Sequence, residues 1–158
     1  MMDSFLWLES TPIASAIRTS VWMYPAFETL PYIGLALLIG SFLLIDLRLL
    51  GFARSLPLPS MLGLLPGVWA GFLINVLTGS LMFTYGATSF GTSRMFWLKM
   101  ALMALAGINA LVFTVAVARD GERWLTAART PAGIRVVATV SLVLWLGVMT
   151  AGRWMAYV

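Results

Sequence analysis

The sequence predicts an all-α fold: a four-helix transmembrane bundle preceded by a short N-terminal amphipathic interfacial helix. The first observation is composition, because 61% hydrophobic and 10% charged residues lie far outside the range of soluble domains. The second is length, since four apolar stretches reach the ~20 residues that a helix needs to cross the hydrocarbon core. The third is the lack of a barrel-like alternation, which leaves helices as the way to pair backbone groups in lipid. We expect one integral membrane domain over residues 1–158, with spans at about 26–50, 61–85, 95–118 and 132–157.

Residues 3–24 are predicted to form the interfacial segment. Within them, "TPIASAIRTSVWMY" places Thr11 as a helix N-cap and Pro12 at the first helical position, where proline is favoured. A stripe at helical spacing follows, made of Ile13, Ile17 and Val21. Aromatic neighbours favour a place in the membrane interface over a soluble docking helix. No basic region precedes this helix, so we do not expect a cleaved signal peptide.

The connections between the spans carry recognisable stop and start signals. Gly51 follows the first span and is predicted to be its C-cap, since glycine adopts the left-handed conformation at low cost. "FARSLPLPS" predicts a short extended connection, and "GATSFGTS" offers Ser93 or Thr92 as the cap of the third span. "DGERWLTAAR" is the longest connection, with a surface helical turn expected around Trp124 and Leu125.

Basic residues predict the orientation of the bundle, because they are enriched on the cytoplasmic side. Six belong to one side: Arg48, Arg54, Arg119, Arg123, Arg129 and Arg135. Four belong to the other: Arg18, Arg94, Lys99 and Arg153. We therefore expect the first side to be cytoplasmic and both termini to face the periplasm or exterior. An aromatic belt is expected at that outer boundary, made of Trp22, Tyr24, Tyr32, Tyr85, Phe96, Trp97, Trp154 and Tyr157.

The second span carries a row of small residues that predicts close helix packing. Gly63, Gly67, Gly71 and Gly79 are spaced by fours, with Asn75 in the same row. Steps of four drift only ~40° around a helix, so the row forms a slowly winding groove in which another helix can lie. Matching small pairs on the other spans are Ala36 and Gly40, Ala106 and Ala110, and Gly147 and Ala151.

Two amides near the middle of the spans, Asn75 and Asn109, are expected to meet. An interhelical hydrogen bond that sets helix register is the favoured interpretation. The alternative is that they line a ligand or ion site, although two uncharged amides are poor ion ligands.

Charged residues lie just inside the ends of the spans. Glu28, Lys99 and Arg153 fall near the outer boundary on three different helices, so Glu28 either pairs with a cation there or all three reach the headgroups separately. At the opposite boundary, Asp46 and Arg48 are expected to cap helix ends or to bind lipid phosphate.

The chain contains no cysteine and no histidine. This excludes disulfides, thiolate metal sites and histidine-ligated haem, and it removes the usual general base. Nucleotide loops and metal-spaced carboxylate pairs are also missing, so we predict no enzyme activity, no catalytic residues, and no bound metal or cofactor. A thioether site for Cu(I) is the alternative, and it would draw on Met82, Met95, Met100, Met103, Met149 and Met155. Ordinary core packing is favoured for these methionines.

Four strings, "WMYPAFETLPYIGLALLIGSFLLIDLRLLG", "WAGFLINVLTGSLMF", "FWLKMALMALAGINALVF" and "LWLGVMTAGRWMAY", resemble an uncharacterised bacterial family of small four-helix integral membrane proteins. The chain is also similar, more distantly, to the membrane domain of the copper-resistance protein CopD. The family pattern places one histidine three residues after Glu28 and another after "NALVF", a pair that would resemble a b-type cytochrome site. Pro31 and Thr114 occupy these positions here, so the resemblance implies that this chain has lost the ligands.

Three functions follow from these observations, in order of preference. The first is a non-catalytic accessory or structural subunit of a larger membrane complex. The second is CopD-like transport of copper or a small solute, and the third is a degenerate cytochrome-like electron-transfer protein. The expected partners are membrane lipid and other membrane subunits or further copies of the chain, with lipid or pigment contacts and no nucleic acid. The resemblance places the protein in the bacterial inner membrane.

Overall fold

The computed structural model describes residues 2–126, 130–155 and 157, with the side chains of Tyr24, Leu125 and Thr126 set aside. Arg129, counted above for orientation, lies outside the described residues, as does the side chain of the predicted belt residue Tyr24. The described residues form helices and no strands, which confirms the all-α fold. In chain order the helices are α1 (Met2–Glu9), α2 (Pro12–Thr19), α3 (Met23–Leu50), α4 (Leu58–Leu62), α5 (Leu65–Tyr85), α6 (Ala87–Thr92), α7 (Arg94–Thr126) and α8 (Ala132–Trp154).

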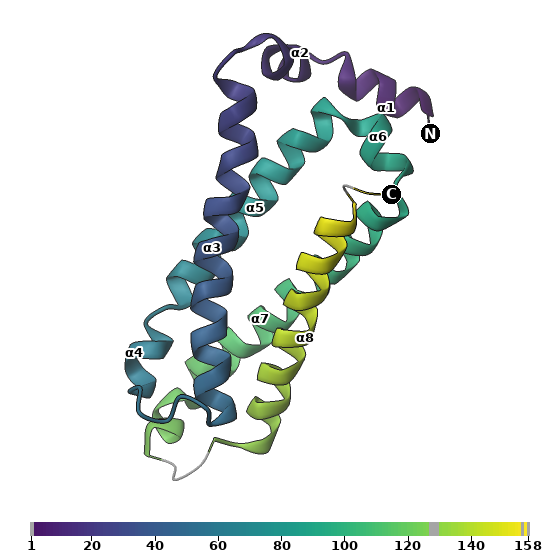
Figure 1. The fold of residues 1–158 in the computed structure, drawn as a ribbon. Coiled ribbons are helices and arrows are strands. Elements are labelled where there is room, and N and C mark those ends of the chain that lie inside the picture. The colour runs from purple at the N-terminus through teal and green to yellow at the C-terminus, as the bar shows by residue number, and fades with distance from the viewer. Residues whose placement is uncertain (1, 127–129, 156, 158) are drawn as a thin grey trace.

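Four segments of the described chain are long and apolar enough to cross a membrane. They are Pro25–Leu50, Leu58–Tyr85, Arg94–Trp124 and Ala132–Trp154. In Figure 1 the helices α1, α2 and α6 gather near both termini, at what we call the upper end of the bundle, and α4 lies at the lower end. The structure therefore confirms four helical segments that could cross a membrane, close to the predicted positions, and adds short helices at both ends.

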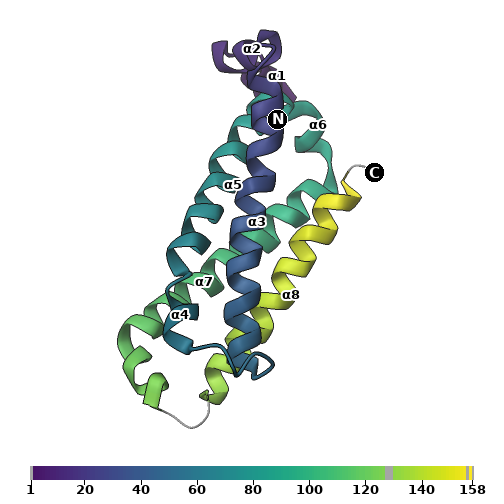
Figure 2. The same ribbon diagram turned by 60° about the vertical axis from the view of Figure 1, so that its left-hand side comes forward.

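The spans pack in the order α5, α3, α8, α7. The helix α3 contacts both α5 and α8, and α8 packs along α7, so α3 occupies the centre of the view in Figure 2. The core between them is made of apolar residues from all four spans: Leu38, Phe42, Ile45, Leu49, Val68, Ala106, Ala110, Phe113, Ala138, Trp145 and Val148.

The end of α3 is as predicted. Gly51 has a φ of 97°, in the left-handed region. Its N–H donates to the carbonyl of Arg48 at 3.2 Å, and the N–H of Phe52 donates to that of Leu47 at 3.0 Å. These two bonds satisfy carbonyls that the helix leaves open at its end.

The second span begins differently from the prediction, because it is broken near its start. The short helix α4 ends at Gly63, whose N–H donates to the carbonyl of Pro59 at 3.0 Å. The helix α5 then starts at Leu65 with Pro66 in its first turn. A proline ring clashes with the carbonyl four residues earlier in a continuous helix, here that of Leu62, so α4 and α5 do not merge.

The N-terminal segment contains one more helix than expected. Thr11 caps α2 as predicted, its side chain accepting from the Ala14 N–H at 3.4 Å. The predicted stripe is wrong at Val21, which lies beyond the end of α2; within the helix Ile17 is buried and Ile13 is 55% exposed. The buried face instead pairs Ala14 with Ile17.

The extra helix α1 packs against α6 at the upper end of the bundle. The Glu9 Oε1 accepts hydrogen bonds from both the N–H and the Oγ1 of Thr88, each at 2.7 Å. The Phe5 ring meets the Phe83 ring edge to face at 6.1 Å. The N-terminal residues are therefore fastened to the connection between α5 and α7.

The third span also differs from the prediction at its ends. Ser93 caps α7, accepting from the N–H of Phe96 at 3.3 Å, as expected. The helix does not stop near residue 118 but continues to Thr126. Trp124 is buried and its ring stacks on that of Phe113, one ring centre 6.3 Å from the other. This contact explains why the expected surface turn is part of the helix.

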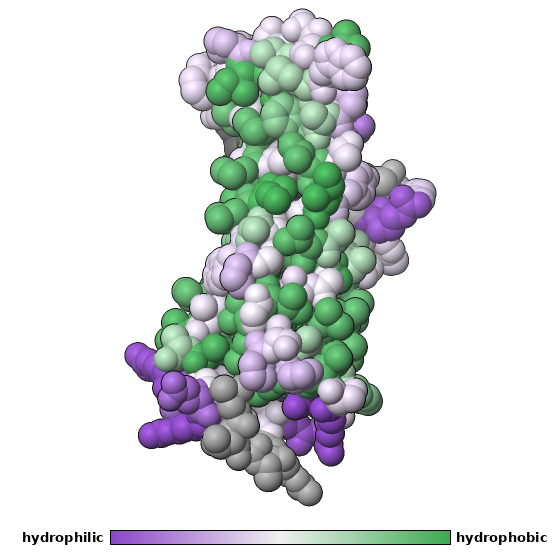
Figure 3. All heavy atoms as spheres, turned by 90° about the vertical axis from the view of Figure 1, so that its left-hand side faces the viewer, coloured by the Kyte–Doolittle hydropathy of each residue, from purple (hydrophilic) through white to green (hydrophobic). Residues whose placement is uncertain are grey.

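The surface of the bundle follows the predicted membrane pattern. Figure 3 shows apolar side chains over most of one face and hydrophilic side chains gathered at the lower end. The helix directions put Arg48, Arg119 and Arg135 at the lower end and Arg18, Arg94 and Arg153 at the upper end. This separation agrees with the two groups counted from the sequence, and the direction of the bundle in the membrane remains a prediction.

Candidate functional site

Two spans approach closely where α3 crosses α5. A Cβ placed on Gly71 would lie 2.5 Å from the carbonyl oxygen of Gly34 and 2.8 Å from the backbone nitrogen of Leu38. One placed on Gly67 would lie 3.0 Å from the Ser41 Oγ and 3.4 Å from the Leu37 Cδ2. The absence of side chains at Gly67 and Gly71 therefore lets α5 lie against α3.

The rest of the predicted glycine row does not take part in this contact. Gly63 belongs to the break between α4 and α5, where its nearest neighbour is its own chain at Ser60. A Cβ on Gly79 would have no atom within 4 Å, and the same is true of a Cβ on Gly40 of α3. The partner on α3 is Gly34 rather than the predicted pair of Ala36 and Gly40, both of which are exposed.

The small pairs predicted on the other two spans lie where α7 and α8 pack. Ala106, Ala110 and Ala151 are buried. A Cβ on Gly147 would lie 3.2 Å from the Leu102 Cδ1 of α7. Small residues thus line the second close pair of spans.

The structure gives the two mid-span amides different partners. The Asn75 Nδ2 donates to the carbonyl of Gly71 at 2.9 Å, and it lies 2.7 Å from the position of a Cβ on Gly34. The Asn109 Nδ2 donates to the carbonyl of Val137 on α8 at 3.2 Å. Asn75 therefore belongs to the α3–α5 contact and Asn109 to the α7–α8 contact, and the expected bond between them is not formed.

The three predicted charged residues lie at the upper end of the spans. Glu28 is exposed on α3. The Lys99 Nζ of α7 lies 3.7 Å from the Cβ position of Gly152 on α8. The Arg153 Nη2 donates to the Tyr157 hydroxyl at 2.6 Å, with its guanidinium 5.1 Å from the centre of that ring. Arg153 therefore has a local partner at the end of its own helix.

The seam between α5 and α7 is closed by large side chains rather than by close backbones. The Trp69 Nε1 donates to the Thr114 Oγ1 at 3.2 Å. The edge of the Phe72 ring lies 2.9 Å from the Cβ position of Gly107. Nearer the upper end, Phe83 of α5 stacks on Phe96 of α7 at 5.2 Å. We call these three contacts the aromatic seam.

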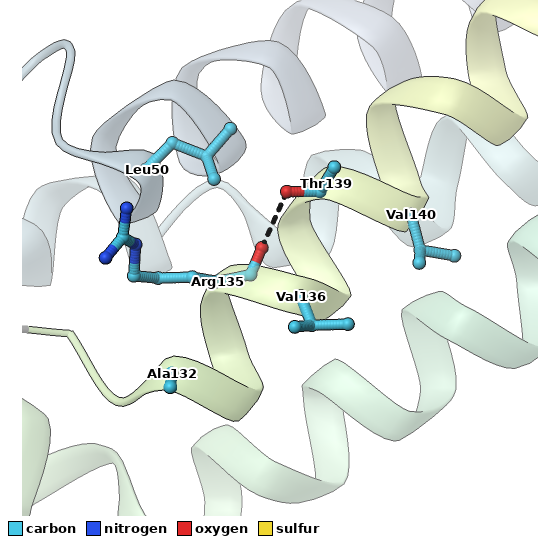
Figure 4. Close-up of a pocket in the computed structure, with 6 residues that line it drawn as sticks. All are labelled: Leu50, Ala132, Arg135, Val136, Thr139 and Val140. Atoms are coloured by element: carbon cyan, nitrogen blue, oxygen red, sulfur yellow. Dashed lines mark hydrogen bonds between the residues drawn. The ribbon is translucent and has the colours of Figure 1, made fainter.

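A groove opens at the lower end beside α8. It has a volume of about 370 Å³ and is lined by Leu50, Ala132, Arg135, Val136, Thr139 and Val140. Figure 4 shows the Arg135 guanidinium below Leu50, and the Thr139 hydroxyl bonded to the Arg135 carbonyl rather than turned toward a ligand. The nearby Arg48 Nε donates to the carbonyl of Leu56 at 2.5 Å, so Arg48 fastens the connection after α3.

A buried polar cluster between α3 and α8 was not predicted from the sequence. Asp46, Ser141 and Trp145 are 3%, 1% and 5% exposed. Each of these side chains has a buried polar atom without a hydrogen-bond partner: Asp46 Oδ2, Ser141 Oγ and Trp145 Nε1. An acid inside an apolar span was a visible signal for Asp46. Nothing in the sequence showed that Ser141 and Trp145 would face it.

The chain matches the sequence model of one protein family. The model describes a family of unknown function, DUF6644, and matches residues 4–158. The chain belongs to this family. No curated protein and no solved structure matches it, and the comparisons show no link to CopD.

The two positions at which the resemblance suggested lost ligands do not form a site in this DUF6644 member. Pro31 lies inside α3, three residues above Gly34, which packs against Asn75. The Thr114 hydroxyl accepts from Trp69, six residues below Asn75 on α5, and donates to the Ala110 carbonyl at 2.8 Å. At ~1.5 Å per residue, the two positions differ in depth by about 13 Å. They therefore do not fit a haem iron held between two axial ligands.

The described residues also offer no conventional metal centre. No three His, Cys, Asp or Glu side chains among them lie close enough to hold one ion. The Cu(I) alternative would rest on thioethers, and of its methionines Met103 packs on the core while Met149 is 44% exposed.

Proposed function

We propose that this protein is a non-catalytic integral membrane subunit that acts by packing against other transmembrane helices in a larger complex. The observation that carries the proposal is how little of each span the chain covers by itself. In the most apolar stretch of each span, taken from the first span to the fourth, the chain buries 33%, 22%, 17% and 22% of the residues. The remaining surface is apolar and must be covered by lipid or by other helices.

The way in which the spans pack inside the chain supports this proposal. Within lipid, helices associate through close backbone contact because apolar side chains gain little by leaving lipid. The α3–α5 contact at Gly34 and Gly71 is of this kind. Gly40 on α3 and Gly79 on α5 are exposed and have no neighbour within 4 Å, so the same kind of contact is open to a helix from outside the chain.

The setting we propose is the bacterial inner membrane, with the lower end in the cytoplasm and both termini in the periplasm. The basic residues at the lower end favour this direction. Other membrane subunits, further copies of the chain, and lipid or pigment are the proposed contacts.

Mass measurement in native lipid tests this function. The protein is extracted from its own membranes in polymer-bounded discs, and the size of the particle is measured by native mass spectrometry. We expect an assembly heavier than the 17.3 kDa chain. Gly79→Leu and Gly40→Leu should leave the chain folded, because neither position has a neighbour, and at least one should release the 17.3 kDa chain from the assembly. A wild-type protein that is folded and monomeric in these discs would contradict the proposal.

Two alternative functions make different demands on the same sample. CopD-like transport of copper or a small solute requires bound metal, or copper-dependent growth that changes when Met82, Met100 and Met103 are replaced by leucine. The cytochrome-like alternative requires a Soret absorption band in the purified protein. Metal analysis and one absorption spectrum therefore separate both from the subunit proposal.

A further inference from the structure

The buried polar cluster between α3 and α8 has a regular geometry. Asp46 lies one helical turn below Phe42 on α3, and Ser141 lies one turn below Trp145 on α8. The rings of Phe42 and Trp145 pack together with centres 5.7 Å apart. The Ser141 hydroxyl lies beside the Asp46 carboxyl, although the Oγ makes no hydrogen bond of ordinary geometry. This aromatic pair therefore lies about one helical turn above the level of Asp46 and Ser141.

Among the residues that the structure describes, none supplies a counter-charge to the Asp46 carboxyl. In the described part of the chain, no Lys or Arg nitrogen lies within 4.0 Å of its oxygens. On its own helix, Arg48 bonds to the carbonyl of Leu56, and in the connection that follows, Arg54 lies against Gly51. On α8, Arg135 lies in the groove beside Leu50.

The other helices packed against α3 at this end contribute no charge either. The sequence from 55 to 93, which includes α4 and α5, contains no Asp, Glu, Lys or Arg. The polar group shown beside the Asp46 carboxyl is therefore the Ser141 hydroxyl, in a core that is otherwise apolar and includes the Phe42–Trp145 ring pair. An isolated carboxylate in such surroundings is very costly, and a group in this position takes up a proton instead.

We propose that Asp46 is an intramembrane proton-binding site. Its carboxyl carries a proton at neutral pH, and the resulting O–H donates a hydrogen bond to the Ser141 Oγ across the α3–α8 contact. Binding adds one proton to the Asp46 carboxylate, which becomes a neutral acid, and release returns that proton to the medium. The hydrogen bond from the protonated carboxyl to Ser141 would join two buried side chains whose oxygens otherwise lack a partner.

A proton fits this site better than a metal cation does. Alkali and alkaline-earth cations need several oxygen ligands, whereas the cluster offers one carboxyl and one hydroxyl. The third polar group, the Trp145 indole, has an N–H donor and no acceptor, so it cannot supply an oxygen or nitrogen ligand to a cation. The indole instead suits an acceptor oxygen, such as that of Asp46 or a water between them.

Infrared spectroscopy of the purified protein in lipid tests the proposal. A protonated carboxyl has a C=O stretch that is separate from carboxylate and amide bands and that shifts in D₂O. We expect the wild-type protein at pH 7 to show this band, and Asp46→Asn to lack it. The matched control Asp120→Asn removes an exposed acid that pairs with Arg123 and should keep the band. Absence of the band from the wild type at pH 7, or its survival in Asp46→Asn, would overturn the proposal.

Two further measurements keep the test decisive if Asp46→Asn does not fold. Raising the pH of the wild-type sample should abolish the band. Ser141→Ala removes the proposed acceptor and should move the band to higher frequency without abolishing it. A wild-type band that appears only when Na⁺ and K⁺ are removed would show that the site binds a cation, which also contradicts the proposal.

Discussion

Replacing Gly71 by alanine tests the close contact between α3 and α5 with a single methyl group. The added Cβ would lie 2.5 Å from the Gly34 carbonyl oxygen and 2.8 Å from both the backbone nitrogen and the Cβ of Leu38. Most of these atoms belong to the backbone of a packed helix, so they cannot turn away as the end of a side chain can.

The size of the effect follows from these distances. Ordinary contact begins at 3.4 Å, so the two helices must separate by about 0.9 Å at this point. Overpacking of this kind costs ~1–3 kcal/mol, and separated neighbours lose part of their dispersion energy. Alanine recovers up to ~1 kcal/mol through its better helix propensity. We expect a net loss of about 0–3 kcal/mol in the free energy of unfolding, and a loss of about 1–3 kcal/mol relative to an alanine that makes the same gain in propensity at a glycine without neighbours.

The same substitution elsewhere on α5 provides matched controls. Gly79→Ala meets nothing within 4 Å, so its effect should be neutral or stabilising by up to ~1 kcal/mol. Gly67→Ala meets only the Oγ of Ser41 and a methyl of Leu37, which can move, so its cost should be intermediate. Leu73→Ile should have little effect, since Leu73 is 55% exposed.

Unfolding in mixed micelles, followed by circular dichroism as the denaturing detergent increases, gives the free energy for each variant. The expected order of stability is Gly79→Ala, then Gly67→Ala, then Gly71→Ala. Equal stability of Gly71→Ala and Gly79→Ala would refute the idea that missing side chains bring α3 and α5 together.

Three further predictions address other contacts. Hydrogen bonds from Thr88 hold the pKa of Glu9 below its usual 4.5. The docking of α1 on α6 should therefore be complete above pH 4.5 and should weaken as the pH falls through the lowered pKa. Hydrogen exchange of residues 2–9 should show this weakening, and Glu9→Gln should remove the pH dependence. In the aromatic seam, a double-mutant cycle of Trp69→Phe and Thr114→Val should give a coupling of ~0.6–1.7 kcal/mol, and zero coupling would mean that their bond does not hold α5 to α7. Asn109→Leu should destabilise the bundle by about 1 kcal/mol because it removes the bond to Val137 of α8; an unfolding curve that matches the wild type would argue against that bond.

The spans were predictable because length and hydropathy determine what can cross a membrane, and α2 was predictable from its Thr11–Pro12 start, whereas α1, α4 and α6 were not. The Gly51 cap, the Thr11 cap and the Ser93 cap depend on local residue chemistry, which the sequence displays directly. The helices α1 and α6 have 8 and 6 residues, too few for a hydrophobic period to stand out. Their formation depends on packing against one another, through Glu9 and Thr88, rather than on local preference.

The packing sites were predictable only in part, because spacing along one helix does not show where a partner crosses it. The row on α5 contained Gly67 and Gly71, which do contact α3, but it also contained Gly63 and Gly79, which do not. Gly34 was missed for the same reason. The cluster around Asp46 depends on which spans are neighbours, and the sequence alone does not state that α3 packs on α8.

The bonds between Glu9 and Thr88 set an order for the biosynthesis of this protein. The two residues are 79 positions apart, and two membrane spans lie between them. The helix α1 therefore has no docking place until the second span has been inserted and α6 has been made. Docking of α1 on α6 therefore requires that both α3 and α5 have already been made.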